Sequence, residues 1–125
     1  MDLLKQLYLS DRSTFVGYDK EHAPGRVVAL IGSDYRPINS LAQGDQGILV
    51  LDETPFYAES GGQVGDTGEI RDGDNVFEVV DTKPHHGAIL HIGTVVSGGF
   101  THDQAVMSTV SMRRPMLRPS SHPPY

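Results

Sequence analysis

Residues 51–68 read LDETPFYAESGGQVGDTG, and this stretch decides how the rest of the chain is organised. It joins a Pro-Phe-Tyr run at 55–57 to several glycines and acidic residues, which is more than a simple turn requires. We predict that a strand at 47–51 enters it and that a strand at 69–71 leaves it. The paired glycines in its middle permit positive φ angles or the close approach of another backbone. The residues alone therefore indicate a long loop whose aromatic side chains cover one end of a small core, without the spacing of a phosphate-binding loop.

The remainder of the chain alternates between short apolar strands and turn residues. An Asp-Gly-Asp sequence at 72–74 is a favourable hairpin turn. In the strand after that turn, Phe77 and Val79 fall on one face and Glu78 on the other. Short strands with frequent turns favour a sandwich or barrel over an α/β fold. The predicted strands, with a short edge segment near residue 38, are 15–18, 26–31, 48–51, 68–72, 75–80, 88–96 and 104–110. The predicted turns and loops include 22–25, 81–87 and 97–99.

The length of 125 residues fits one domain, which is large enough to bury a single core without disulfides or metals. Residues 1–12 are predicted to be a linker with a short helix at 2–8, because the leucines there fall on one helical face. Residues 13–112 are predicted to form the β domain. Residues 113–125 contain four prolines and are predicted to be an irregular tail.

The charge of the chain is acidic, with 16 Asp and Glu residues against 10 Lys and Arg residues and a formal net charge of −6. Such a chain is expected to bind RNA weakly and in a strongly salt-dependent way. Three of the basic residues, Arg113, Arg114 and Arg118, lie together in the tail, which has no acids. The absence of cysteine excludes disulfides and thiolate zinc sites and suits a reducing cytoplasm. We predict neither a signal peptide nor a membrane span, and therefore expect a cytoplasmic protein without a membrane partner.

The run TPFYAESGGQVGD at 54–66 resembles the signature of alanyl-tRNA synthetases in the β-barrel that precedes their editing domain. Free-standing alanyl-tRNA editing proteins share this signature. The match has no gaps, and further segments fall in the expected order along the chain. These segments are 15–18, 27–31, 47–52, 80–82 and 91–93, so the resemblance covers residues 13–112.

The resemblance implies an all-β fold, a small closed or partly open barrel similar to the second domain of translation factors. It also implies that the chain is a piece of a longer ligase that attaches alanine to its tRNA. In that parent, the barrel would position the editing domain and would not itself be catalytic. The resemblance suggests Glu59, Ser60, Gly61, Gly62 and Gln63 as the contact with the tRNA acceptor end or the editing pocket. ATP, Mg and Zn are implied as cofactors of the parent, and tRNA and the adjoining synthetase and editing domains as its partners.

The six histidines do not form a recognised metal-binding pattern. His85, His86 and His91 lie close in sequence, but His85 and His86 are expected to point to opposite sides of an extended chain. We therefore predict surface or loop histidines rather than a zinc site. No Ser-His-Asp or Cys-His pairing that would support nucleophilic catalysis is evident. We predict no metal, no cofactor and no catalytic residue in these 125 residues.

The sequence departs from the family pattern near its end. In the family, the barrel is followed by a His-x-x-x-His motif that, with a later cysteine and histidine, holds the editing zinc. Here the sequence after Arg114 reads PMLRPSSHPPY, and His122 has no histidine four residues on. Truncation, divergence and an altered reading frame each account for this departure. We expect this chain alone to be inactive.

Two other functions fit the same sequence. The first is a remnant of a free-standing alanyl-tRNA deacylase, which predicts a histidine pair in a longer gene product and no upstream adenylation domain. The second is a plain interaction module with no RNA role. The flanking gene sequence separates the first from a synthetase fragment, and a tRNA-binding measurement tests the second.

Overall fold

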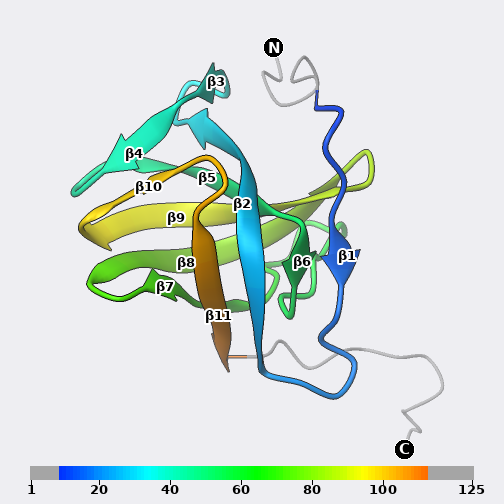
Figure 1. Ribbon diagram of the computed structural model, residues 1–125. Coiled ribbons are helices and arrows are strands. Elements are labelled where there is room, and N and C mark those ends of the chain that lie inside the picture. The colour runs from blue at the N-terminus through cyan, green and yellow to red at the C-terminus, as the bar shows by residue number, and fades with distance from the viewer. Residues whose placement is uncertain (1–8, 113–125) are drawn as a thin grey trace, which may run out of the picture.

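The computed structural model describes residues 9–112, which form an all-β fold without a helix (Figure 1). The predicted helix at 2–8 and the predicted tail at 113–125 lie outside the described residues. Most strands are short, as predicted, and three longer ones bend around the molecule. The strands are β1 (Thr14–Phe15), β2 (His22–Gly32), β3 (Pro37–Ile38), β4 (Ser40–Ala42), β5 (Gln46–Leu51), β6 (Glu53–Thr54), β7 (Thr67–Asp72), β8 (Asn75–His85), β9 (Ala88–Ser97), β10 (Gly99–Thr101) and β11 (Ala105–Met112).

Six of these strands close into an antiparallel barrel in the order β2, β5, β9, β8, β7, β11. Closure depends on β11, which pairs with β7 on one side and with β2 on the other. Ser108 of β11 shows this double pairing, because it faces Ala23 of β2 and Ile70 of β7. A closed barrel leaves no unpaired strand edge. The barrel predicted from the sequence is confirmed.

The interior of the barrel is filled by alternate residues of its strands. The interior cluster includes Phe77 and Val79, which confirms the prediction that these two residues share one face of the strand. Phe77 packs edge-to-face on Phe100 of β10, with ring centroids 6.1 Å apart. Phe56 is also fully buried in this cluster, so the aromatic run at 55–57 contributes directly to the core. The other members are Val27, Leu30, Leu41, Leu49, Leu51, Ile70, Val95, Val106 and Val110.

Glycine permits close strand contact at one level of the barrel. Gly47 of β5 faces Gly93 of β9. A Cβ at Gly93 would lie 1.8 Å from the carbonyl oxygen of Glu78 on β8. No side chain fits in that space, and the pairing of β8 with β9 has a bulge just beyond it, between Val79 and Asp81.

A second apolar cluster lies on the outer face of β2, β5 and β9. It contains Ile31, Val50 and Leu90, which are fully buried, and Leu9 packs against it. The segment that begins at Leu9 continues into β1, which pairs in parallel with β6. The N-terminal segment therefore joins this outer face to the start of the loop that follows β6.

The prediction of a loop at 81–87 is wrong. β8 continues to His85 and joins β9 through a turn at His86 and Gly87, whose φ angles are 50° and 90°. A positive φ is uncommon for a residue other than glycine, so the sequence does not reveal this turn. Because His86 is not extended, its ring lies against that of His85, with centroids 4.6 Å apart, and the two do not point to opposite sides.

The prediction of a turn at 22–25 is also wrong, because β2 begins at His22. Pro24 faces Met107 of β11, and β5 pairs with β2 only from Val27 onwards. Before Val27, β2 therefore pairs with β11 but not with β5. A proline is tolerated on the side of a strand that has no pairing partner. The strand predicted at 15–18 is shorter in the structure, where β1 covers only Thr14–Phe15. The predicted hairpin turn at 72–74 is confirmed, with φ of 59° at Gly73.

Candidate functional site

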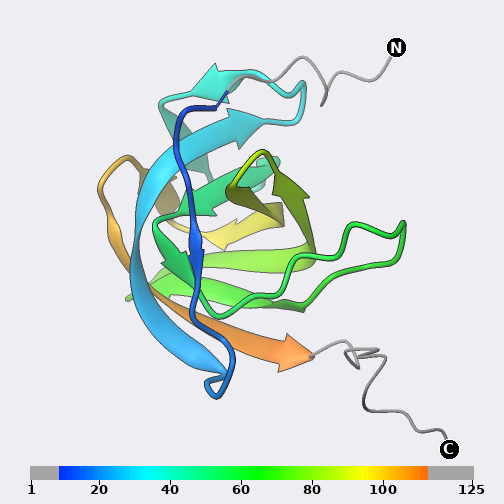
Figure 2. The same cartoon turned by 90° about the vertical axis from the view of Figure 1, so that its right-hand side faces the viewer.

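The residues predicted to form a site lie in the loop between β6 and β7, residues 55–66, which we call the signature loop. Figure 2 shows this loop extending away from the barrel. All five predicted residues, from Glu59 to Gln63, are consecutive in its middle. Residues 60–64 are all exposed, and we call them the tip. The position of the tip is determined by the contacts at the base of the loop.

Asp66 fixes the two ends of the signature loop to each other. Its backbone N–H donates to the carbonyl oxygen of Tyr57 at 3.1 Å, and its carboxylate Oδ2 accepts the N–H of Tyr57 at 2.8 Å. Asp66 is fully buried, so a loss of either bond would leave a polar group without water. The base of the loop is therefore held closed by one backbone hydrogen bond and one bond to the Asp66 side chain.

Strand β8 supplies a second set of contacts beneath the loop. The Thr82 hydroxyl donates to the carbonyl oxygen of Asp66 at 2.8 Å, and the Thr82 carbonyl accepts the N–H of Glu59 at 3.1 Å. The Asp81 carboxylate accepts the N–H of Gly65 at 2.7 Å. A Cβ at Gly65 would lie 2.3 Å from the Thr82 carbonyl oxygen, so this glycine is required for the loop to rest on β8.

A lysine of β8 holds the loop close to the tip. Lys83 Nζ donates to the carbonyl oxygen of Gln63. The same ammonium group lies 3.7 Å from the carboxylate of Asp81, which is itself bonded to the loop. These contacts connect Gln63 to the barrel wall, so the tip is attached to β8 as well as to its own base.

A buried histidine on β9, His91, connects the start of the loop to the barrel, so the prediction of a surface or loop histidine is wrong at this position. His91 Nδ1 lies 2.8 Å from the carbonyl oxygen of Leu49, and His91 Nε2 lies 2.8 Å from Thr54 Oγ1. A carbonyl only accepts, so Nδ1 carries the proton and Nε2 accepts the Thr54 hydroxyl. Thr54 Oγ1 then accepts the N–H of Phe56 at 3.1 Å. Burial lowers the pKa of His91 to about 4, and the bond to Leu49 opposes this only in part, so the imidazole is neutral at pH 7.

The paired glycines of the tip have few neighbours. Gly62 has a φ of 83°, the first of the two alternatives that the sequence left open, and a Cβ there would meet no atom within 4 Å. Gly61 is not among the residues with positive φ, and a Cβ there would meet only Oε1 of Glu59, at 3.3 Å. That oxygen is the end of a flexible side chain and accepts the Gly61 N–H at 3.0 Å. Within residues 9–112, backbone conformation explains glycine at position 62, but nothing explains it at position 61.

An aromatic cluster beside the signature loop was not predicted. Phe15 of β1 packs edge-to-face on Tyr18 and on Tyr57, with ring centroids 4.8 and 5.8 Å apart. The parallel pairing of β1 with β6, where Phe15 faces Thr54, brings these rings together. Tyr18 remains 84% exposed. The only signal in the sequence is the Phe-Val-Gly-Tyr run at 15–18, whose proximity to Tyr57 depends on the fold.

The histidines do not assemble into a metal site in the part of the chain that the structure describes. No group of three or more His, Cys, Asp or Glu side chains is placed there to hold an ion. His91 uses both ring nitrogens in the hydrogen bonds to Leu49 and Thr54. His85 and His86 contact each other at the β8–β9 turn. Residues 9–112 also contain no helix with the length and apolar character needed to cross a membrane.

Comparison with known proteins identifies the family. The family described as tRNA synthetases class II (A) matches residues 1–114. This chain belongs to the class II (A) tRNA synthetases. Curated relatives of this synthetase chain are alanine–tRNA ligases, so the resemblance to alanyl-tRNA synthetases is confirmed.

Three of these relatives show how much of a ligase the synthetase chain corresponds to. The alanine–tRNA ligase of Psychrobacter cryohalolentis is 41% identical over 114 residues, which are 88% of this chain and 13% of the relative. That of Leptospira borgpetersenii is 42% identical over 109 residues, 86% of this chain and 12% of the relative. The alanine–tRNA ligase of Pseudomonas entomophila is 44% identical over 101 residues, which are 81% of this chain and 11% of the relative. The chain therefore spans only 11–13% of the length of these relatives.

Proposed function

We propose that this chain is the non-catalytic β-barrel of an alanine–tRNA ligase and that it positions the editing domain. The tip of the signature loop would contact the tRNA acceptor end or the editing pocket. One observation carries the proposal, namely the contrast between the base of the loop and its tip. The base is fixed by the buried carboxylate of Asp66 and by Thr82. The tip presents Gly61 and Gly62 with open space around them. A fixed loop with an open glycine tip suits a partner that approaches the backbone closely.

The role of Gly61 follows from what surrounds it. No contact within the described residues prevents a side chain at this position, apart from the movable carboxylate of Glu59. A glycine that residues 9–112 do not require suits the approach of a partner. Sugar and phosphate groups of a nucleic acid are contacted by backbone N–H groups as well as by side chains, so a glycine tip suits the end of a tRNA.

The charge of the chain limits what the tip does alone. With a net charge of −6, the chain has little electrostatic attraction for RNA, and most of the affinity for tRNA would come from other parts of the ligase. The tip would then add a positioning contact after the tRNA is bound. This division of roles explains how an acidic barrel works beside a nucleic acid.

The chemistry of the parent is proposed to lie in its other domains. Attachment of alanine to tRNA would use ATP and Mg, and editing would use Zn held by residues outside this barrel. Because the resemblance assigns the chemistry to other domains, we expect this chain alone to have neither ligase nor deacylase activity. We expect it to act in the cytoplasm.

The test is made in the full-length parent enzyme with Gly61→Val and Gly62→Val. Both variants are expected to reduce clearance of mischarged tRNA more than charging of the correct tRNA, because a branched side chain blocks close approach to the tip. The measurements are deacylation of mischarged tRNA and aminoacylation, each as kcat/KM. Equal loss of both activities would indicate misfolding, and no loss in either would contradict the proposal.

Gly73→Val is a matched control for Gly62→Val. Gly73 also has a positive φ, 59°, and a Cβ there would likewise meet no atom within 4 Å. It lies in the β7–β8 turn, outside the signature loop. The control therefore reproduces the backbone strain of Gly62→Val without changing the tip. Similar editing in the two variants would assign the effect to strain alone.

A further inference from the structure

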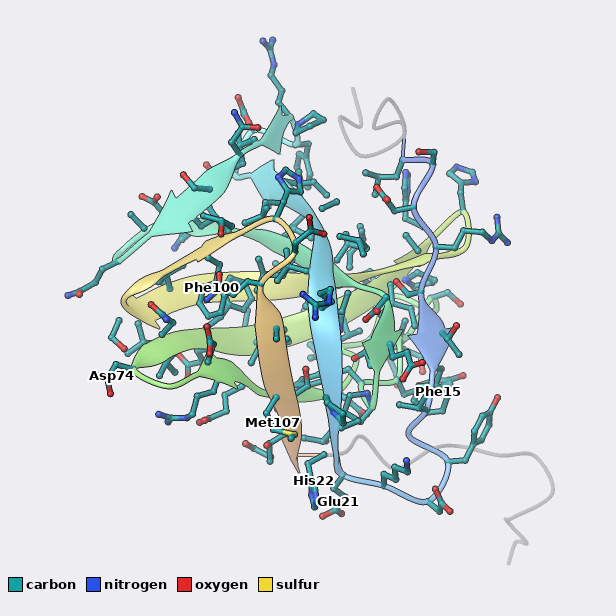
Figure 3. All side chains as sticks on the ribbon, viewed as in Figure 1. Phe15, Glu21, His22, Asp74, Phe100 and Met107 are labelled. Carbon is teal, nitrogen blue, oxygen red and sulfur yellow. The ribbon has the colours of Figure 1, made fainter. Side chains whose placement is uncertain are left out.

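Strand β8 contacts different parts of the chain along its two halves. Residues 75–79 pair with β7, whereas residues 81–83 contact the signature loop. Figure 3 shows Asp74, which precedes β8, on the opposite side of the barrel from Phe15, which faces Thr54 just before the loop. The contacts with the loop therefore come from the second half of β8.

Hydrogen bonds fix the residues on either side of Gly62 in the tip. The N–H of Gly61 donates to Oε1 of Glu59 at 3.0 Å, and the carbonyl oxygen of Gln63 accepts the ammonium of Lys83. Within residues 9–112, no hydrogen bond involves Gly62, whose φ is 83°. Gly62 therefore offers its backbone N–H and C=O to a partner, at a place that its neighbours determine.

The Lys83 ammonium is itself held in place by a carboxylate. Its Nζ lies 3.7 Å from Oδ2 of Asp81, and the two side chains are only 23% and 22% exposed. The other carboxylate oxygen, Oδ1, accepts the N–H groups of Gly65 and Thr82 at 2.7 and 2.8 Å. A partly buried ion pair is screened less by salt than an exposed one, and a bond from an ammonium to a carbonyl is charge-assisted. Lys83 is thus a fixed support on the barrel wall.

The tip requires such a support because its own backbone has unusual freedom. Gly61 and Gly62 are adjacent, and glycine has more conformational freedom than any other residue. Residues 60–64 are exposed, so side-chain packing restricts them little. The bond from Lys83 to Gln63 joins the tip directly to the barrel wall. Without this bond, we expect the tip to adopt several conformations and Gly62 to lose its fixed position.

We propose that Lys83 is a positioning residue for the tip, and that its ammonium, held by Asp81, fixes Gln63 so that Gly62 meets the tRNA acceptor end or the editing pocket in one orientation. This inference rests on the proposed function of the tip. It assigns a role in editing to a residue of β8, outside the signature loop. Lys83 acts through Gln63 and has no contact with the tRNA.

The first test measures the order of the tip in the whole 125-residue chain. Lys83→Met removes the ammonium but keeps a long side chain. By nitrogen-15 relaxation, we expect the order parameter of the Gly62 amide to fall from about 0.85, typical of fixed backbone, to below about 0.6. Lys83→Arg keeps a cationic donor and should retain most of the order. An unchanged order parameter in Lys83→Met would overturn the inference.

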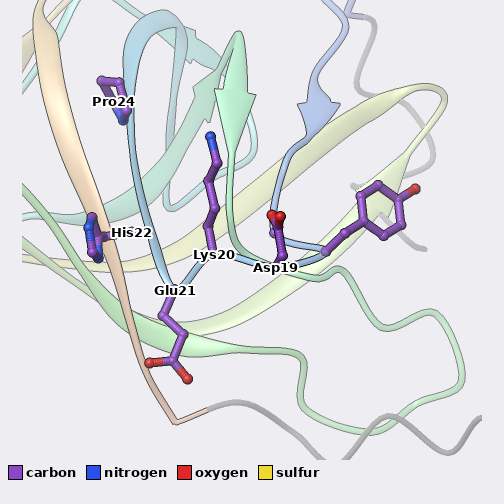
Figure 4. A pocket seen from close by; sticks show the side chains of 7 residues that line it. Asp19, Lys20, Glu21, His22 and Pro24 are labelled. Carbon is purple, nitrogen blue, oxygen red and sulfur yellow. The ribbon is translucent and has the colours of Figure 1, made fainter.

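Lys20→Met is the matched control for this substitution. Lys20 is the other lysine among residues 9–112, and it lies outside the signature loop. Figure 4 shows it among the side chains of residues 17–22 and Pro24, which line a separate hollow. Its replacement removes the same charge and should leave the order of the Gly62 amide unchanged. Equal loss of order in Lys20→Met and Lys83→Met would count against a specific role of Lys83.

The second test measures catalysis in the full-length parent. In Lys83→Met we expect kcat for deacylation of mischarged tRNA to fall about tenfold, because the bound acceptor end is misplaced. KM for the tRNA and the rate of charging should change less than twofold, and Lys83→Arg should recover most of the lost kcat. A merely structural role of Lys83 would reduce charging and editing alike, and that result would contradict the inference.

A direct contact of Lys83 with an RNA phosphate would give a different result. Loss of a phosphate contact raises KM and reduces the dependence of log KM on log salt by about one. We expect this dependence to be the same in Lys83→Met and in the unaltered enzyme. A reduced dependence with unchanged kcat would overturn the inference and assign Lys83 to phosphate binding.

Gly62→Val in the same assay separates failure of this inference from failure of the proposed function. Impaired editing in Gly62→Val with normal editing in Lys83→Met would leave the proposed function of the tip intact and refute the role of Lys83. Normal editing in both variants would refute the proposed function, and the inference with it.

Discussion

The Thr54 hydroxyl and the His91 imidazole meet inside the barrel, with Oγ1 and Nε2 2.8 Å apart, although 37 residues separate them in sequence. Thr54 ends β6, and the His91 ring on β9 packs edge-to-face on Phe56, with centroids 5.3 Å apart. The pair therefore connects the start of the signature loop to the wall of the barrel. We infer that the loop and the core form one cooperative unit.

The substitution Thr54→Val tests this connection. It leaves the N–H of Phe56 and the Nε2 of His91 buried without their partner, so we expect the free energy of unfolding to fall by about 1–3 kcal/mol. Urea denaturation of the isolated chain measures this. Thr109→Val on β11 is the control, because Thr109 is exposed and its change should stay within about 0.5 kcal/mol. Equal effects in the two variants would contradict the role of Thr54.

The low pKa of His91 predicts a loss of stability in acid. Its pKa is about 4 in the folded chain and near 6.5 when the chain unfolds. Above pH 6.5 both states are neutral, and below it only the unfolded state binds the proton, so stability falls as the pH falls from about 6.5 to about 4. The loss amounts to about 3 kcal/mol near pH 4. Urea titrations at several pH values measure it.

His91→Gln provides the comparison for this pH dependence. The variant is less stable at pH 7, but the part of the pH dependence that comes from His91 should disappear. Carboxylates contribute to both proteins in the same range, so the difference between the two curves is the quantity to measure. Parallel curves would show that His91 does not carry the effect.

Removal of the Asp66 carboxylate is expected to loosen the signature loop. In Asp66→Ala the N–H of Tyr57 loses its acceptor, so we expect about 1–3 kcal/mol of lost stability. Hydrogen exchange at the Tyr57 amide should become faster than at amides of β5 and β9. Asp45→Ala is the control, since Asp45 accepts the N–H of Ala42 at an exposed site. Unchanged exchange at Tyr57 would contradict the role of Asp66.

The parts of this fold that could be predicted from sequence are those set by local chemistry. The Asp-Gly-Asp turn at 72–74 needs only a residue that accepts positive φ, and the shared face of Phe77 and Val79 needs only the alternation of side chains along a strand. The positive φ of Gly62 is one of the two conformations that the paired glycines permit. Each of these features depends on residues that are neighbours in the chain.

The parts that could not be predicted depend on residues far apart in sequence. Phe15 reaches Tyr57 only because β1 pairs with β6. Pro24 is misleading as a turn signal because the strand pairing of β2 changes along its length. His86 turns with a φ of 50°, which its residue type does not announce. In each case the tertiary structure overrides the local preference.

Removal of the Ser108 hydroxyl should not lower the stability of the barrel, unlike the substitutions at Thr54 and Asp66. Its side chain is fully buried, and among the described residues its Oγ has no hydrogen-bond partner. A buried hydroxyl without a partner costs about 1–3 kcal/mol, whereas its replacement by hydrogen leaves only a small gap. We expect Ser108→Ala to unfold at equal or higher urea concentration, with a gain of up to about 1 kcal/mol in the free energy of unfolding.

Ser97→Ala is the control for this substitution. Ser97 Oγ donates to the carbonyl oxygen of Asp74, and loss of this bond should destabilise the chain by about 0.5–1.5 kcal/mol. A clear loss of stability in Ser108→Ala would mean that this hydroxyl has a partner in solution.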